Sequence, residues 1–230
     1  MGKADLIFPH LALWIDPTPR AAAENMAVDE LLFRSAPPQP VLRFYRWLRP
    51  AFSFGYFQKW ETIQPFLPPG VEAVRRWTGG GLVDHRHDVT YTLIIPASQG
   101  LAKTPSRDLY RMIHERLAGL LRDAGHACGL APARNEPPSA IGRCFAGGHA
   151  EHDILSPGGK ISGAAQRRHR LGILHQGSLA VEPLPDTFPA RFAASLAAAT
   201  FALQATGIEE SGLAALTQSR YAAPEWRHLR

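Results

Sequence analysis

The apolar residues of this chain fall into short runs, and the length of those runs constrains the fold more than any other feature. Residues 41–47, 52–57, 71–77 and 89–95 are rich in β-branched and aromatic side chains and have the length of strands. The run over residues 91–97 is among the longest, whereas a membrane-spanning helix needs about 20 apolar residues. The sequence therefore predicts a globular protein with strands in its core and no membrane association.

Helical segments interrupt these strands. Thr18 is the predicted N-cap and Pro19 the first residue of one helix, which Pro37 ends. Leucine, isoleucine and methionine recur at helical spacing over residues 109–121, and Gly125 is placed to end that helix. An alanine-rich helix is predicted over residues 188–205, after two more strands near residues 160–167 and 172–181.

Strands and helices in this order predict one α+β domain over residues 1–230, with a mixed, largely antiparallel sheet and flanking helices. Residues 41–47 and 52–57 are expected to pair with each other, because both alternate and are rich in aromatic residues. Residues 132–159 are rich in proline, glycine and histidine and are expected to form a long irregular loop. A loop of that length inside a compact domain is often functional.

The composition narrows the partners and the compartment. A formal charge of +5 favours an acidic protein partner or nucleic acid. The arginines are scattered, without a basic stripe or a nucleic-acid motif, which argues against nucleic acid. The chain has no signal-peptide pattern, and its two cysteines, Cys128 and Cys144, do not make a disulfide framework. We therefore expect a cytoplasmic location.

A glycine triplet follows the predicted strand over residues 71–77. Glycine lets the backbone turn sharply, and successive N–H groups form an anion-binding nest. Flanking arginines supply charge for a carboxylate, a phosphate or a developing oxyanion. The alternative is a glycine-rich hairpin turn with solvated arginines. The spacing favours a binding loop that contains Arg76, Thr78, Gly79, Gly80, Gly81 and His85.

A second glycine-rich segment surrounds Lys160, one of only four lysines in the chain. A lysine ammonium is a compact point charge, which suits polarisation of a carbonyl better than a guanidinium fork. Gly158, Gly159 and Gly163 keep the surroundings small enough for an acyl chain to approach. The alternative is that Lys160 begins an exposed strand.

These segments resemble the lipoate–protein ligase, octanoyltransferase and biotin ligase superfamily over nearly the whole chain. The resemblance implies a catalytic domain of the biotin/lipoate ligase type, without an accessory C-terminal domain. It is carried by the two glycine-rich segments and by residues 25–30, 42–45, 54–58, 175–179, Tyr221, Glu225 and Trp226.

The resemblance also implies roles for individual residues. Lys160 contacts the acyl carbonyl, while Arg76, Thr78 and the glycine triplet line the acyl pocket and, in ligases, the adenylate pocket. A loop-closing role and a catalytic role both stay open for His85. The other expected substrate-binding residues are Ser162, Gly163, Ala165, Arg167, His175, Gln176 and Gly177.

Members of this superfamily activate the acyl group in two ways. Ligases use ATP and Mg to make an acyl-adenylate, whereas cysteine-dependent transferases take the acyl group from a carrier-protein thioester and need no cofactor. The segment Arg143-Cys144-Phe145, ahead of Lys160, resembles the transferase nucleophile. The complete glycine triplet is more usual in ligases, and Arg86 stands where an acidic residue is common. We favour a transferase with Cys144 and Lys160 as catalytic residues, and a lipoate–protein ligase as the alternative.

The chemistry of a thiol is consistent with the transferase. Only a thiolate attacks, and Arg143, Lys160 and nearby histidines favour the thiolate of Cys144. Exchange between a thioester and a thiol needs no ATP. The expected donor is octanoyl- or lipoyl-loaded acyl carrier protein, and the expected acceptor is a lysine of a lipoyl domain or of glycine-cleavage H protein. An imidazole or Lys160 itself accepts the proton of that lysine.

Two other classes of function remain as alternatives. A non-catalytic protein that binds carrier domains or nucleic acid is disfavoured by the intact Lys160 and Arg76. A metal site made by Cys144, His149 and His152 lacks the complete spacing of a structural zinc site, so no metal is predicted.

Overall fold

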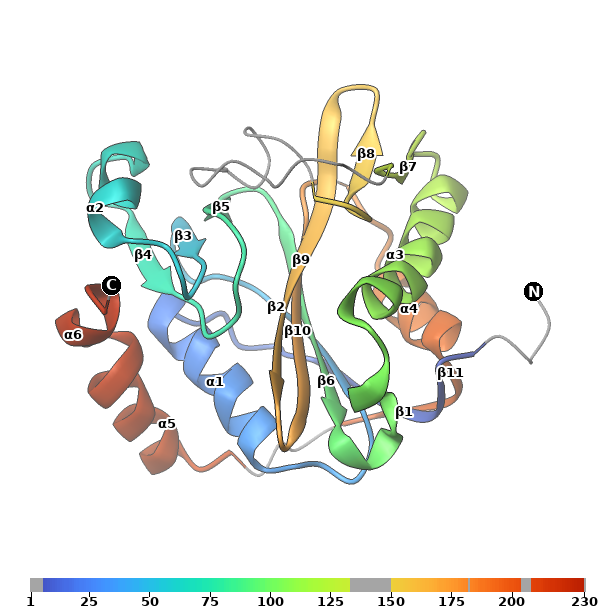
Figure 1. Ribbon diagram of the computed structural model, residues 1–230, viewed down its shortest axis with the longest axis horizontal. Helices are drawn as coiled ribbons and strands as arrows, with labels where there is room; N and C mark the ends of the chain where they lie inside the picture. Colours follow the sequence, from blue (N-terminus) through green and yellow to red (C-terminus); the bar gives the residue numbers. More distant parts are fainter. Residues whose placement is uncertain (1–5, 133–149, 182, 204–207, 230) are drawn as a thin grey trace.

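The structure is a computed structural model that describes residues 6–132, 150–181, 183–203 and 208–229 (Figure 1). A large twisted sheet runs through the middle of the molecule. Its strands, in spatial order, are β11 (Ala197–Ala202), β1 (Phe8–Ile15), β2 (Val41–Tyr45), β6 (Val89–Pro96), β10 (Gly172–Leu179), β9 (Gly159–His169), β8 (Ile154–Ser156) and β7 (Gly129–Leu130).

The pairing within this sheet confirms a mixed, largely antiparallel arrangement. Strand β1 is parallel to both of its neighbours, β11 and β2. The other neighbouring strands, from β2 through to β7, are antiparallel.

Helices cover both faces of the sheet, and alternate strand residues face opposite layers. On β6, Tyr91, Leu93 and Ile95 belong to the apolar cluster under α3 (Ser106–Asp123) and α4 (Phe188–Leu196). Ile94 belongs instead to the cluster under α1 (Ala22–Arg34). Figure 1 shows α1 and the pair α3 and α4 on opposite sides of the strands. Successive residues of a central strand therefore face the two layers in turn.

A second, smaller sheet lies on the same side as α1. It has the order β4 (Glu72–Arg75), β3 (Ala51–Phe54) and β5 (Val83–Asp84), with β3 parallel to β4 and antiparallel to β5. The prediction that residues 41–47 and 52–57 pair with each other is therefore wrong. Both β2 and β3 are buried at every position, so alternation carried no information about their partners.

Two helix predictions also needed correction. The first helix begins at Ala22 and not at Pro19, because Glu24 accepts a hydrogen bond from the backbone N–H of Ala21 and caps the helix there. The alanine-rich helix ends at Leu196, and the chain continues as β11 because pairing with β1 outweighs the helix propensity of alanine. The prediction for α3 holds, with Gly125 just after it at φ +93°.

The structure describes part of the expected loop over residues 132–159. Its last residues form β8 and the start of β9, joined in a hairpin at the top of Figure 1. Residues 133–149, with Cys144 and His149, lie outside the described residues.

The C-terminal helices pack along α1. They are α5 (Glu210–Leu216), the π-helical turn η5 (Thr217–Tyr221) and α6 (Pro224–Arg227). Tyr221 donates a hydrogen bond of 2.6 Å to the buried Glu30 of α1. The side chain of Arg75 donates a hydrogen bond of 2.8 Å to the backbone oxygen of Trp226. The indole of Trp226 donates one of 3.0 Å to the backbone oxygen of Arg75. The C-terminal segment therefore holds the end of β4, where the glycine loop begins.

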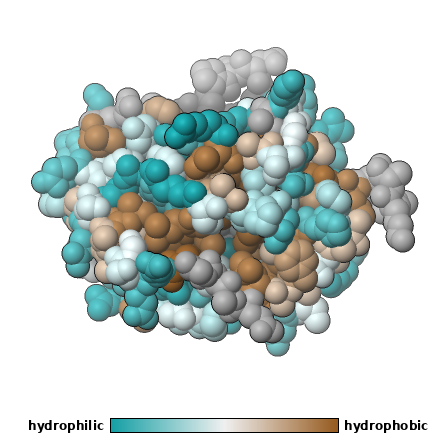
Figure 2. Space-filling view, turned by 90° about the horizontal axis from the view of Figure 1, so that it is seen from below, coloured by the Kyte–Doolittle hydropathy of each residue, from teal (hydrophilic) through white to brown (hydrophobic). Residues whose placement is uncertain are grey.

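The remaining elements are short. Helix α2 (Trp60–Ile63) and the 3-10 turn Gln64–Phe66 connect β3 to β4, and two further 3-10 turns, Ala97–Gln99 and Leu101–Lys103, precede α3. Figure 2 shows apolar side chains across the middle of the face seen from below, with hydrophilic side chains around much of its rim. Among the described residues, no helix combines the length and apolar character that crossing a bilayer requires.

A buried polar network joins α1 to the sheet. Arg43 of β2, which is fully buried, donates a hydrogen bond of 2.7 Å to Asp29 of α1 and also pairs with Asp16 at 2.7 Å. The second carboxylate oxygen of Asp29 accepts hydrogen bonds from Thr92 of β6 at 2.6 Å and Gln176 of β10 at 2.8 Å. One carboxylate therefore links a helix to three strands.

Replacing Asp29 by alanine should lower the free energy of unfolding by about 3–5 kcal/mol, because it leaves the Arg43 charge buried with one fewer partner. Urea denaturation followed by circular dichroism measures the change. Asp123→Ala is the matched control, because Asp123 pairs with Arg191 at 2.9 Å with exposed side-chain fractions of 61% and 45%. Such a surface pair is worth about 1 kcal/mol or less. Equal losses in the two variants would contradict the role of Asp29.

Candidate active site

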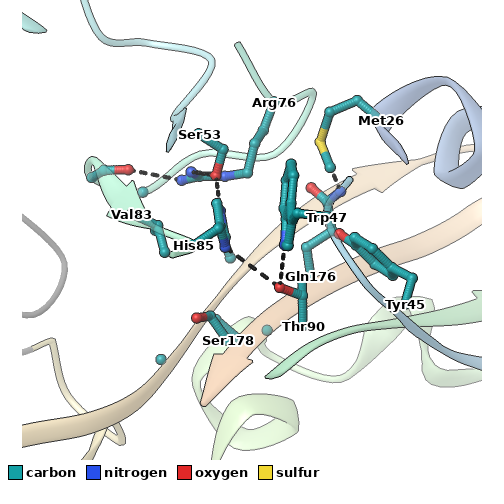
Figure 3. A pocket seen from close by; sticks show the side chains of 16 residues that line it. Met26, Tyr45, Trp47, Ser53, Arg76, Val83, His85, Thr90, Gln176 and Ser178 are labelled. Atoms are coloured by element: carbon teal, nitrogen blue, oxygen red, sulfur yellow. Dashed lines mark hydrogen bonds between the residues drawn. The ribbon is translucent and has the colours of Figure 1, made fainter. Parts of the chain in front are cut away.

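A pocket lies between the large sheet and the small sheet (Figure 3). Tyr45 of β2, Gln176 of β10 and Ala165 of β9 line it on one side, and Ser53 of β3 and Arg76 line it on the other. It encloses about 410 Å³, including the solvent at its mouth.

The glycine loop forms one wall and is held by Arg76. The guanidinium of this residue donates hydrogen bonds of 2.9 Å to the carbonyls of both Gly79 and Gly81. Gly80 has φ +88°, a conformation that L side chains rarely adopt. A Cβ on Gly55 would collide with the backbone of Gly79 and Gly80. The loop therefore needs glycine both for its own turn and for the strand packed against it.

Thr78 anchors the start of this loop to the large sheet. Its hydroxyl donates a hydrogen bond of 2.7 Å to the side-chain oxygen of Gln176. The amide nitrogen of Gln176 in turn donates to Asp29. Both Thr78 and Gln176 are buried, so this chain of hydrogen bonds sets the distance between the loop and β10.

His85 belongs to a hydrogen-bonded chain that crosses the pocket wall. The hydroxyl of Ser53 accepts a hydrogen bond from Arg76 at 2.7 Å and forms another with Nε2 of His85 at 2.6 Å. The other ring nitrogen, Nδ1, donates to the carboxylate of Asp88 at 2.7 Å. The ring also stacks on Trp47 at 4.1 Å between centroids. Both ring nitrogens of His85 therefore have hydrogen-bond partners, which fixes the chain that follows the glycine loop.

Lys160 lies next to the pocket, at the end formed by β9. Its ammonium pairs with Asp153 at 2.7 Å, and the two side chains are only 9% and 5% exposed. The pairing of β8 with β9 shifts by one residue here, since Ile154 faces Ser162 and Leu155 faces Lys160. Such a bulge interrupts strand alternation and redirects a side chain.

Gly163 gives the Lys160 side chain its path. A Cβ built on Gly163 would lie 2.5 Å from Cε and 2.6 Å from Nζ of Lys160, and 2.9 Å from Oδ1 of Asp153. Gly163 also lines the pocket together with Gly80 and Arg76. The structure therefore brings both glycine-rich segments to one site, with the ammonium at its edge.

Ser162 and His175 are not among the residues that line the pocket. His175 faces α3, where its ring contacts Tyr91, Tyr110 and His114. Burial holds its pKa well below the usual range, so the ring is neutral. Strand neighbours point to opposite faces, which is why Gln176 reaches the pocket and His175 does not. The expectation that the two lie along the same site is not met.

Of two other expected residues, Gly177 lines the pocket and Arg167 does not. Gly177 contributes backbone to it, and a Cβ there would collide with the ring of Tyr91 on the opposite face. Arg167 is half-buried, with its guanidinium 4.3 Å from the ring centroid of Trp77 and 5.4 Å from that of Tyr56. Burial lowers the pKa of Arg167.

Several residues of the site were missed from sequence. Ser53, Asp88 and Asp153 have buried polar side chains that complete its hydrogen-bond network. Isolated serine and aspartate residues carry no motif, and only the fold brings them to their partners. In the described part of the chain, no three histidine, cysteine, aspartate or glutamate side chains gather as metal ligands. Cys144 and His149 lie outside that part, so the metal alternative is not tested.

Comparison with known proteins identifies the family. Residues 21–218 match the lipoyl protein ligase A/B catalytic domain, and the chain therefore belongs to that family. The octanoyltransferase LipM of Oceanobacillus iheyensis is 35% identical over 188 residues, 76% of this chain and 67% of that protein. The LipM of Carboxydothermus hydrogenoformans is 34% identical over 176 residues, 74% of this chain and 64% of that protein. The chain thus matches about two thirds of the length of these relatives.

A solved structure shows the same fold. Protein Ta0514 of T. acidophilum, with bound lipoic acid, superposes with a TM-score of 0.72 at 20% identity, over 97% of this chain and 99% of that chain. The family and the fold type predicted from the sequence are confirmed.

Replacing Gly163 by alanine should displace Lys160 from Asp153, because the new methyl group takes the space of the lysine side chain. We expect acyl transfer to fall at least about tenfold, in line with the sensitivity of rates to small misplacements. The free energy of unfolding should also fall, because the substitution disturbs a buried ion pair, and thermal melting measures that loss separately. Gly129→Ala is the control, since nothing lies within 4 Å of its Cβ position. Unchanged activity in Gly163→Ala would show that the position of Lys160 is unimportant.

Proposed function

We propose that this chain is an octanoyltransferase that moves an octanoyl or lipoyl group from a thioester on acyl carrier protein to a lysine of a carrier domain. The acceptor is a lipoyl domain or glycine-cleavage H protein, and the reaction takes place in the cytoplasm, where thiols stay reduced. The observation that carries the proposal is a pocket with apolar walls that ends beside a buried lysine–aspartate pair. The octanoyltransferase relatives supply the reaction class.

The walls of the pocket suit an acyl chain. Met26, Tyr45, Trp47 and Val83 supply apolar and aromatic surface, and the backbone of Gly163 leaves room beside them. Apolar walls with a few polar groups are the usual composition of a small-molecule site. We place the hydrocarbon against these side chains and the carbonyl at the end nearest Lys160.

Lys160 then acts on the carbonyl. Its ammonium stabilises the oxygen when negative charge develops in the tetrahedral intermediate. Asp153 holds the ammonium at the end of the pocket, and a fixed charge needs no reorganisation during the reaction. Lys160 and Cys144 are the two catalytic residues of this proposal.

The acyl group passes through Cys144. Its thiolate attacks the carbonyl of the donor thioester, the carrier thiol leaves, and an octanoyl thioester remains on the enzyme. The amine of the acceptor lysine then attacks this thioester, loses a proton to a base, and forms an amide as the Cys144 thiol is released. Each step exchanges one acyl bond for another, so no ATP is consumed. A lipoate–protein ligase, which uses ATP and Mg, is the competing function.

The first test is the donor and the covalent intermediate. Octanoyl-loaded acyl carrier protein, without ATP, should give a hydroxylamine-labile octanoyl adduct on the peptide that contains Cys144, measured by mass spectrometry. An apo lipoyl domain should discharge the adduct onto its lysine. Cys144→Ala should lose both the adduct and the transfer, because no other group carries the acyl chain.

Cys128→Ala is the matched control. Burial raises the pKa of the Cys128 thiol, and its sulfur contacts the carbonyl of Ala118, so it is a poor nucleophile. This variant should keep both the adduct and the transfer. Transfer at the normal rate by Cys144→Ala, or activity only with octanoate and ATP accompanied by pyrophosphate release, would contradict the proposal and favour the ligase.

Lys160→Ala should lower the rate of transfer by about a hundredfold or more, the usual effect of removing one group that stabilises an oxyanion. The fold should be retained, because the lost group does not fill the apolar core. Steady-state kinetics with octanoyl-loaded carrier protein measures the effect. Lys103→Ala removes an exposed lysine of the 3-10 turn before α3 and should match the wild type. Wild-type activity in Lys160→Ala would remove Lys160 from the mechanism.

A further inference from the structure

The residue before Asp153 has an unusual backbone conformation. His152 has φ +71°, and Ala36 is the only other described residue besides glycine with a positive φ. Residues held in this region cost conformational energy and persist where the surroundings fix them. The turn is closed on both sides, since the N–H of Asp153 donates to the carbonyl of Ala150 at 3.1 Å and the N–H of Ala131 donates to the carbonyl of Asp153 at 2.7 Å.

This turn sets the direction of the Asp153 carboxylate. Its Oδ2 atom accepts both from the N–H of Ala150 at 2.5 Å and from the ammonium of Lys160 at 2.7 Å. Asp153 is 4% exposed, so water does not readily replace these partners. The position of the ammonium therefore depends on the backbone of His152.

His114 of α3 holds that backbone from the opposite side. Its Nδ1 atom donates a hydrogen bond of 2.6 Å to the carbonyl of His152. The carbonyl only accepts, so the proton is on Nδ1. Burial lowers the pKa of His114, which leaves the ring neutral, and among the described residues Nε2 has no hydrogen-bond partner.

Packing alone does not explain why the residue at position 114 is a histidine. Neighbouring positions on the same face of α3, Leu109, Ile113 and Leu117, are fully buried and apolar. His114 is 1% exposed and contacts the rings of Tyr110 and His175. An apolar side chain would fill the same space without leaving a buried nitrogen unpaired. What the imidazole adds is the bond to His152.

We propose that His114 is a positioning residue for Lys160, acting through the carbonyl of His152 and the carboxylate of Asp153. The inference rests on the proposed function, since it assigns Lys160 to catalysis. His114 does not touch the substrate: it lies in the layer of α3, while the pocket lies on the face of α1. It fixes the strained turn, and the turn aims the carboxylate that holds the ammonium at the end of the pocket.

Two substitutions separate the hydrogen bond from packing. His114→Asn keeps an N–H donor close to the place of Nδ1, whereas His114→Gln places its donor near Nε2 and loses the bond to His152. We expect His114→Gln to lower kcat by about ten- to a hundredfold, with the KM for octanoyl-loaded carrier protein unchanged, because a misplaced group costs rate before it costs binding. His114→Asn should retain most of the wild-type kcat. Thermal melting of both variants controls for stability.

A second readout reports on Lys160 without requiring activity. Incorporation of lysine labelled with ¹³C at Cε gives each lysine side chain an NMR signal, and Lys160→Arg assigns that of Lys160. The Lys160 signal should move in His114→Gln and stay near its wild-type position in His114→Asn. Equal kcat in the two variants, or an unmoved Lys160 signal in His114→Gln, would overturn the proposal. Failure of the proposed function looks different, because the wild-type protein itself would then transfer no octanoyl group.

Discussion

The buried contact between Arg43 and Asp29 is the interaction on which the site depends. A charge at that depth has to be paired, and the carboxylate of Asp29 pairs with the arginine of β2 while it accepts from Thr92 on β6 and Gln176 on β10. Gln176 then receives the hydroxyl of Thr78 at the start of the glycine loop. A single path of hydrogen bonds therefore runs from α1 through the sheet to the wall of the pocket. An apolar substitute would pack as well, but it would not fix the loop.

Strand alternation then separates two sets of polar residues. Gln176 points to the layer that contains the glycine loop, and its neighbour His175 points to α3. The same rule places Tyr91 under α3 and α4, and Thr92 toward α1. Histidines on the α3 side are buried and neutral, so they act through directed hydrogen bonds and not through charge. Residues of the α3 layer can therefore position backbone and side chains of the site without lining the pocket.

Sequence predicted the parts of the molecule that depend on local pattern. The spacing of leucines gave α3, and the glycine triplet gave a loop that the structure shows at the pocket, with Gly80 in a conformation that needs glycine. The predictions that were wrong concern segments whose pairing depends on residues far away in the sequence. Strand β3 pairs with β4 and not with β2. The alanines after Leu196 form a strand because they pair with the edge of β1. Asp153 belongs to no sequence motif. Its pairing with Lys160 depends on the bulge between β8 and β9.

The geometry of Arg76 bears on the shape of the pocket. Here the guanidinium donates to the carbonyls of Gly79 and Gly81 and to the hydroxyl of Ser53, all of them neutral acceptors of the protein itself. These hydrogen bonds stiffen the glycine loop at the wall of the pocket. The fold is shared with a lipoate-binding protein at 20% identity, so the fold alone does not decide between the two chemistries. The lysine–aspartate pair at the end of the pocket is placed to stabilise one oxyanion, which the proposed transfer from a thioester requires.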